Sequence, residues 1–228
     1  MTIRSSNPAL TIFPAVSSDF RLHIIRGDNE EIVEDFDKNA MKDLCAVITL
    51  GDAFSFLSDL VLEEFPRRGD LIKNDKLISI PLRLRDRNDV EHEYSLDIAG
   101  WIGAYKSTKG RKAEMTDFPD NFISLFANKK MGEFNILPIV GQNKLNEVYV
   151  VGQLHVDLFE LTELPDMALS NRQGYKSDDP RYIALLDYVR SDLLAETLRL
   201  REVYTDIINA DKKQRKLDEQ KKKEDELR

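Results

Sequence analysis

The sequence predicts an α+β protein with a mixed β-sheet of about five strands, packed helices and a long C-terminal helix. Two strand-like segments in succession, residues 78–84 and 93–103, predict a β-hairpin. From Arg181 to residue 228 neither proline nor glycine interrupts the chain, which is typical of one long helix. These patterns divide the chain into a sheet domain, residues 1–179, and a helical segment, residues 180–228.

The strand predictions depend on the spacing of apolar residues. Five segments have the composition of strands: residues 20–25, 78–84, 93–103, 122–126 and 148–157. Pro81 lacks a backbone donor, so its strand is expected at an edge of the sheet. Residues 148–157 are long and apolar enough for a central strand. The patterns over residues 1–75 are weaker, and the mixed, acidic stretch 30–65 predicts no definite element.

The helical segment begins at an acidic cap, Asp178-Asp179-Pro180, with proline in the first turn. Its apolar residues repeat every seven positions to about residue 210, at Leu186, Leu193, Leu200 and Ile207. This repeat predicts either a coiled-coil seam or a helix that packs on the sheet in its first half. Residues 211–228 hold eight basic and six acidic side chains, so we expect a charged tail.

Composition narrows the class of protein. The formal net charge of −8 argues against a dedicated nucleic-acid-binding module, which usually carries a basic face. The single cysteine, Cys45, excludes an internal disulfide and a multi-cysteine zinc site. No apolar stretch is long enough to span a bilayer, and the first residues do not form a signal peptide. We therefore expect a cytoplasmic protein without membrane contact.

Common catalytic motifs are missing from the sequence. It has no glycine-rich phosphate loop and no serine nucleophile motif. His155 and Asp157 occupy the same face of a predicted strand and would begin a metal site, but no third ligand is identifiable. The sequence therefore predicts no complete metal site. A metal-dependent nuclease or hydrolase that uses these two residues remains an alternative function.

Four segments appear in an order that resembles a known domain. They are Gly100-Trp101-Ile102-Gly103, residues 151–158, Ala168-Leu169-Ser170-Asn171-Arg172-Gln173-Gly174, and Asp179-Pro180-Arg181-Tyr182. Together they resemble the second domain, the transducer, of GHKL-type ATPases related to the heat-shock chaperone, MutL and MORC groups. The resemblance spans residues 100–190 and implies a βαβ-type mixed sheet.

In that family a basic residue in the loop after the last central strand reaches the terminal phosphate of ATP. Arg172 matches this position, with Gln173 and Lys176 as secondary candidates. A guanidinium can donate two parallel hydrogen bonds to phosphate oxygens and stabilise the charge that develops in phosphoryl transfer. A loop arginine paired with Asp166 or Asp178 is the structural alternative.

The nucleotide-binding motifs that precede a transducer are absent from this chain. Either the chain is a fragment or it works with a separate ATPase subunit, and ATP and Mg²⁺ would be bound there. Alone it is expected neither to bind nor to hydrolyse ATP. The resemblance implies a coupling module that relays the ATP state to its C-terminal helical segment and contacts DNA only indirectly. Such a module would act in DNA repair, restriction or phage defence. The helical segment would dimerise through residues 182–210 or bind a partner. A non-catalytic coiled-coil adaptor is the third alternative function.

Overall fold

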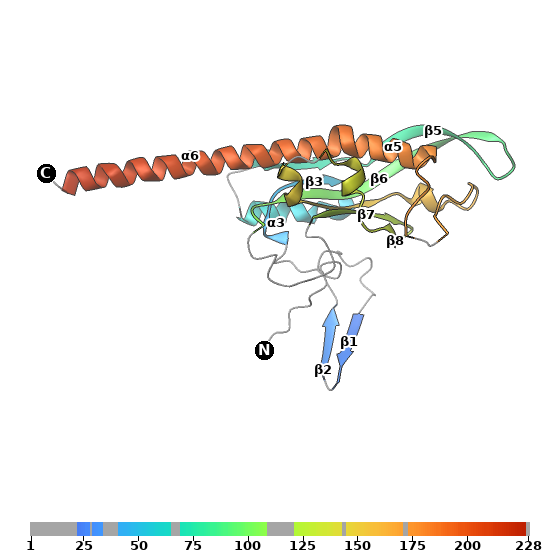
Figure 1. The fold of residues 1–228 in the computed structure, drawn as a ribbon, viewed down its shortest axis with the longest axis horizontal. Helices are drawn as coiled ribbons and strands as arrows, with labels where there is room; N and C mark the ends of the chain where they lie inside the picture. The colour runs from blue at the N-terminus through green and yellow to red at the C-terminus, as the bar shows by residue number, and fades with distance from the viewer. Residues whose placement is uncertain are drawn as a thin grey trace.

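The computed structural model describes residues 22–27, 29–33, 41–64, 69–108, 121–142, 145–170 and 173–226. Its strands are β1 (Leu22–Arg26), β2 (Asn29–Val33), β3 (Leu44–Leu50), β4 (Ile72–Asp75), β5 (Ile78–Arg85), β6 (Glu91–Tyr105), β7 (Phe122–Ala127), β8 (Lys130–Glu133) and β9 (Val150–His155). Its α-helices are α3 (Phe56–Glu64), α4 (Leu137–Val140), α5 (Pro180–Tyr188) and α6 (Leu194–Glu226). Short 3-10 turns are η1 (Asp52–Phe54), η2 (Gly69–Leu71), η3 (Leu145–Tyr149) and η4 (Asp157–Glu160). Figure 1 shows the long helix α6 beside the sheet.

The main sheet is mixed and has seven strands, so the α+β prediction is confirmed and the strand number is larger than predicted. Six strands follow the order β4-β3-β6-β9-β7-β8, and β5 pairs with β6 beside this path. The pairs β3–β4 and β7–β9 are parallel, and the other pairs are antiparallel. The first predicted strand corresponds to β1, which pairs with β2 in a separate two-stranded sheet.

Strand β6 connects two parts of the sheet. Its first half pairs with β5 in the predicted hairpin, and its second half lies between β3 and β9. Pro81 lies on β5, which pairs with β6 alone among the described strands, as an edge position requires. Gly100 marks the change of partners and has φ of 130°. A Cβ at this position would lie 2.1 Å from the carbonyl oxygen of Gln153, so only glycine fits.

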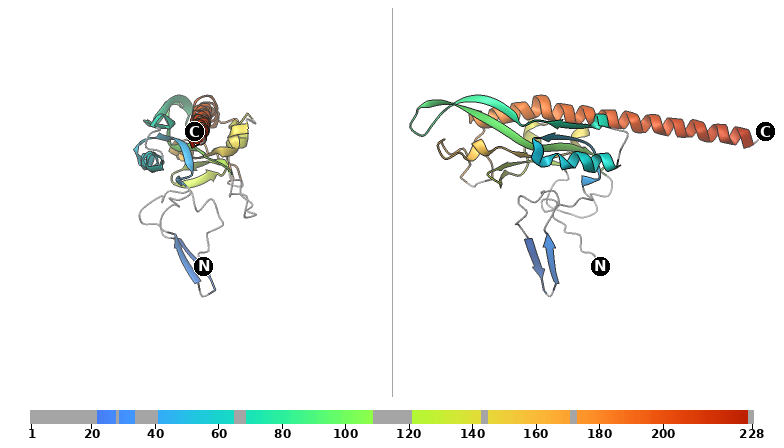
Figure 2. Two further views of the ribbon diagram at one scale, coloured as in Figure 1. Left: turned by 90° about the vertical axis from the view of Figure 1, so that its left-hand side faces the viewer. Right: turned by 180° about the vertical axis from the view of Figure 1, so that it is seen from behind.

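Helices cover both faces of the sheet (Figure 2). One face packs against α5 and α6 through side chains such as Leu185, Val189 and Leu198. The opposite face packs against α3 through Leu57 and Val61. Both faces of the central strands are therefore buried, which is why β3, β7 and β9 consist almost wholly of buried residues.

The C-terminal helical segment is continuous from Pro180 to Glu226, with a π-helical turn at Val189–Leu193 between α5 and α6. Asp179 caps it by accepting a hydrogen bond from the backbone nitrogen of Arg181, at 3.0 Å. The heptad residues Leu186, Leu193 and Leu200 are buried in the core beneath the helix. The first part of the predicted seam therefore faces the sheet of its own chain, and dimerisation through residues 182–210 stays a prediction.

Arg201 fixes α6 to the end of β6. Its side chain is 7 % exposed and donates from Nε to the carbonyl of Tyr105, at 3.0 Å, and from Nη2 to that of Lys106, at 3.1 Å. The guanidinium also lies 4.3 Å from the centre of the Tyr149 ring and hydrogen-bonds Thr205. One arginine thus joins α6, β6 and η3.

The structure bears on two expectations from composition, one about Cys45 and one about membrane-spanning helices. Cys45 is buried in β3, and burial raises the pKa of its thiol to about 12, so it is unreactive at neutral pH. Among the described residues, no helix combines the length and the apolar character needed to cross a membrane.

Candidate functional site

The loop between β9 and α5 is the segment on which the predicted site residues lie. The two sides of this loop pair at an isolated β-bridge between Ala168 and Tyr175. Two backbone hydrogen bonds close it, from Leu169 to the carbonyl of Gly174 at 2.9 Å and from Lys176 to that of Met167 at 2.8 Å. The described residues of segment 168–175 therefore form the two sides of a loop closed at its base, and Lys176 directly follows it. We call it the bridged loop.

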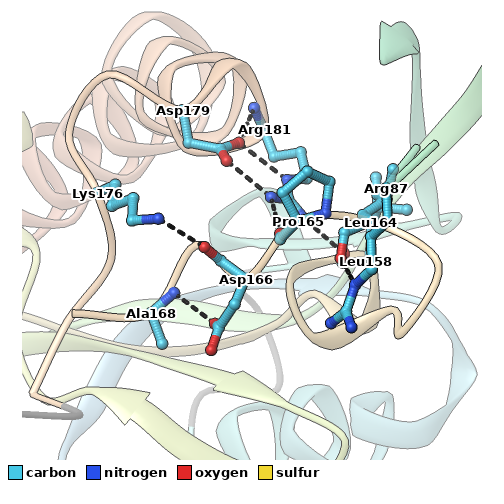
Figure 3. Close-up of polar contacts among 9 residues, drawn as sticks. All are labelled: Arg87, Leu158, Leu164, Pro165, Asp166, Ala168, Lys176, Asp179 and Arg181. Atoms are coloured by element: carbon cyan, nitrogen blue, oxygen red, sulfur yellow. Dashed lines mark hydrogen bonds and ion pairs between the residues drawn. The ribbon is translucent and has the colours of Figure 1, made fainter. Parts of the chain in front are cut away.

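Arg181, in the first turn of α5, ties the segment that leads into the bridged loop to this helix (Figure 3). Its side chain is 3 % exposed and forms a two-point ion pair with Asp179, with Nε–Oδ1 at 2.9 Å and Nη2–Oδ2 at 2.7 Å. Nη2 also donates to the carbonyl of Pro165 at 2.9 Å, and Nη1 reaches that of Leu158 at 3.5 Å. A buried guanidinium has several donors to satisfy, and here it uses them to join η4, the loop and the first turn of α5.

Two more cations hold the segment that leads into the bridged loop. Lys176 Nζ donates to the carbonyl of Asp166 at 2.7 Å, and Arg87 Nε, from the β5–β6 hairpin, donates to that of Leu164 at 3.0 Å (Figure 3). The carboxylate of Asp166 accepts from the backbone nitrogen of Ala168 at 2.9 Å. The frame of the loop is thus fixed by charged side chains that bind backbone groups.

An acidic and aromatic cluster supports the other side of the bridged loop. Glu133, in β8, accepts a hydrogen bond from the Tyr182 hydroxyl at 2.8 Å and one from the backbone of Tyr175. Burial raises the pKa of the Glu133 carboxyl, although both hydrogen bonds oppose this shift. Burial likewise raises the pKa of Tyr175 to about 12, and its ring lies 4.8 Å from that of Phe159. Glu133 therefore links the sheet edge, the loop and α5.

The predicted site residues have different positions on this frame. Arg172 and its neighbour Asn171 lie outside the described residues, so the accessibility predicted for Arg172 stays a prediction. Gln173 is exposed near the tip of the bridged loop. Lys176 is exposed at the base, where its ammonium already binds one carbonyl.

His155 and Asp157, the start of the alternative metal site, have other partners. His155 lies between Phe54 and Phe126, with ring centres 5.2 Å and 5.1 Å away, and its Nε2 is 3.0 Å from Nε2 of Gln153. Burial lowers the pKa of His155, so the neutral ring is favoured. Asp157 accepts from the backbone nitrogen of Asn128 at 2.7 Å. Within the described ranges, no three His, Cys, Asp or Glu side chains are grouped to hold a metal ion.

Comparison with known proteins gives one partial similarity. Over 99 residues the chain is 32 % identical to a protein described as "Putative type II restriction enzyme HgiDII" from Herpetosiphon aurantiacus. The matched segment covers 43 % of this chain and 15 % of that relative. No family model and no solved structure matches the chain significantly. None of these comparisons bears on the resemblance to a transducer domain, which stays a prediction.

Sequence reasoning missed the residues that build the frame. In the sequence Arg181 stands out only as part of the segment Asp179-Pro180-Arg181-Tyr182, although an arginine directly after an Asp-Pro cap is well placed to bind that aspartate. Glu133 has no signal in the sequence, because its partners Tyr175 and Tyr182 are more than forty residues away along the chain. Contacts at that separation depend on the sheet register, which local patterns do not determine.

Proposed function

We propose that this chain is a coupling module of a GHKL-type ATPase. In this proposal the bridged loop presents Arg172 to an ATP site on a preceding nucleotide-binding domain or a separate subunit. Gln173 and Lys176 assist it, and the segment α5–α6 relays the ATP state. The supporting observation is Arg181, in the first turn of α5, which binds the cap residue Asp179 and the carbonyl of Pro165 in the segment that leads into the bridged loop. A displacement of the loop by nucleotide would therefore be transmitted to the long helix.

The chemistry of the proposed sensor follows from its side chain. The phosphoryl group being transferred carries charge on several oxygens, and a planar guanidinium can donate two hydrogen bonds to them at once. A lysine at the same position would keep the charge but lose the paired donors. ATP and Mg²⁺ would be held by the partner, and this chain would contribute the arginine alone.

The partial similarity to a putative type II restriction enzyme favours restriction among the DNA-linked roles that the resemblance implies. The net charge of −8 fits an indirect link to DNA, because direct phosphate binding needs a basic surface. We therefore place this module in a cytoplasmic restriction or defence assembly, with DNA bound by another part.

The test is the ATPase turnover of the complete assembly, with the nucleotide-binding partner present. Replacing Arg172 with Ala should lower kcat by about a thousandfold with little change in KM, the effect typical of an arginine that acts in the transition state. Arg83→Ala, an exposed arginine on β5, is the matched control and should leave kcat unchanged. Wild-type turnover in Arg172→Ala rejects the sensor role. Micromolar ATP affinity of the isolated chain in calorimetry would contradict the proposal that ATP is bound by the nucleotide-binding partner.

The name of the similar protein also favours a second candidate, a metal-dependent nuclease. Incubation of the purified chain with duplex DNA and Mg²⁺ separates the two proposals. Cleavage that disappears in His155→Ala and in Asp157→Ala would support the nuclease, whereas the coupling module should leave the DNA intact.

A further inference from the structure

Among the described residues, none packs over the outer part of α6 in the way that usually stabilises a helix. Every residue from Asn209 to Glu224 is exposed, and Figures 1 and 2 show this part of α6 projecting beyond the sheet. We call residues 209–226 the arm. Helices in proteins gain most of their stability by packing an apolar face. The arm has one large apolar side chain, Leu217, and it is 44 % exposed.

The arm instead carries charges at the spacing that stabilises a helix from within. Residues four apart are neighbours on a helix surface, and opposite charges there attract. Four such pairs occur between residues 211 and 224: Asp211–Arg215, Arg215–Glu219, Asp218–Lys222 and Glu219–Lys223. A side-chain hydrogen bond from Gln214 to Asp218 at 2.9 Å adds to them. The segment also lacks glycine, proline and β-branched residues, so its intrinsic helix propensity is high.

The heptad seam of the inner helix does not continue into the arm. The positions that follow Leu200 and Ile207 at intervals of seven are Gln214 and Lys221. A second helix packed on this seam would bury an amide and an ammonium group, which disfavours a coiled coil. The charge pairs, by contrast, need no partner helix.

We infer that the arm is a free-standing rod, a helix held by its own charge pairs without a second copy of the chain or a partner helix. This inference goes beyond the proposed function and holds whether or not the chain serves an ATPase. At 1.5 Å per residue the arm is about 27 Å long. A tilt of about 10° at its base would move its end by about 5 Å, so a rigid rod of this kind enlarges small movements of α5 on the sheet.

Two substitutions with the same change in net charge test the rod in the full-length chain. Arg215→Glu replaces two attractive pairs with two repulsive ones, with Asp211 and Glu219. Lys212→Glu is the matched control, since it converts the like-charged pair Lys212–Lys216 into an attractive one. Hydrogen exchange of the arm amides should be slow in the wild type and independent of protein concentration. It should become about fivefold faster in Arg215→Glu, and unchanged or slower in Lys212→Glu.

Three results would contradict the inference that the arm is a free-standing helix. One is exchange in the wild-type arm as fast as in an unstructured peptide. Another is an equal effect of the two substitutions. The third is pairing of arms, detected as a short distance between chains by a spin label at Gln220→Cys, an exposed position. High salt offers a further check, because screening should reduce the difference between the two variants.

Discussion

Removal of Arg201 should destabilise the whole domain, because this side chain joins the long helix to the end of the central strand β6. Arg201→Ala removes the hydrogen bonds that Arg201 donates to the carbonyls of Tyr105 and Lys106, and it removes the stack on Tyr149. The site is nearly closed to solvent, since Arg201 is 7 % exposed. Water therefore replaces the lost donors only in part.

The magnitude follows from these contacts. A hydrogen bond with a charged partner contributes about 1.5–3 kcal/mol, and a cation–π contact about 0.5–1 kcal/mol. Two such hydrogen bonds and one stack give a loss of about 3.5–7 kcal/mol in the free energy of unfolding. That is a large part of the stability of an ordinary domain. Arg201→Lys should lie between the wild type and Arg201→Ala, because lysine keeps the charge but not the planar fork.

The assay is urea unfolding followed by the fluorescence of Trp101, the single tryptophan, which is fully buried in β6. Arg199→Ala is the matched control on the same helix. Arg199 pairs with Glu196 at 2.7 Å, but its side chain is 54 % exposed, so its loss should cost less than about 1 kcal/mol. If Arg201→Ala and Arg199→Ala destabilise equally, the argument for a buried clamp is wrong.

The cluster beside the bridged loop yields two more predictions. Burial raises the pKa of Glu133 above its ordinary value of 4.5, so the folded chain binds more protons than the unfolded chain above that pH. Stability contributed by the protonated carboxyl is lost as the pH rises through the raised pKa of the folded chain. Relative to the wild type, Glu133→Gln should therefore become more stabilising in thermal melts as the pH rises above about 4.5, until the wild-type carboxyl is ionised. A difference in melting temperature that does not change with pH would contradict this prediction. At Gly132 a Cβ would lie 1.7 Å from the hydroxyl oxygen of Tyr175, which is buried and has no hydrogen-bond partner among the described residues. Gly132→Ala should therefore lower the urea midpoint, whereas Tyr175→Phe alone should be nearly neutral. In the double variant Tyr175→Phe should restore only part of the midpoint, because the ring carbon Cζ stays 2.4 Å from the added Cβ. An unchanged midpoint in Gly132→Ala would refute the clash.

The sequence predicted the elements whose patterns are local. The β5–β6 hairpin, strand β7, the central position of β9 and the cap at Asp179 all agree with the structure. Strand β3 was missed because its residues are buried on both faces and show no alternation. The π-helical turn at Val189–Leu193 was missed because nothing in a heptad repeat indicates an added residue.

The candidate site was less predictable than the fold. Its loop was recognised as polar and placed between a strand and a helix. The closed form of the loop depends on the bridge between Ala168 and Tyr175 and on Arg181, a residue that looks from the sequence like any charged residue in a first helical turn. Burial decides the role of such a side chain, and burial depends on the assembled sheet.

The arrangement around β6 has a consequence for how the chain folds. Of its three partners, β5 alone is close in sequence, whereas β3 and β9 reach it across long stretches of chain. Closing a short loop costs less entropy, so the hairpin should form early and offer the second half of β6 as a template. Helix α6, whose residue Arg201 binds the end of β6, is then added last. During synthesis on the ribosome, one face of the sheet would therefore stay uncovered until α6, which follows all the strands in the chain, has emerged.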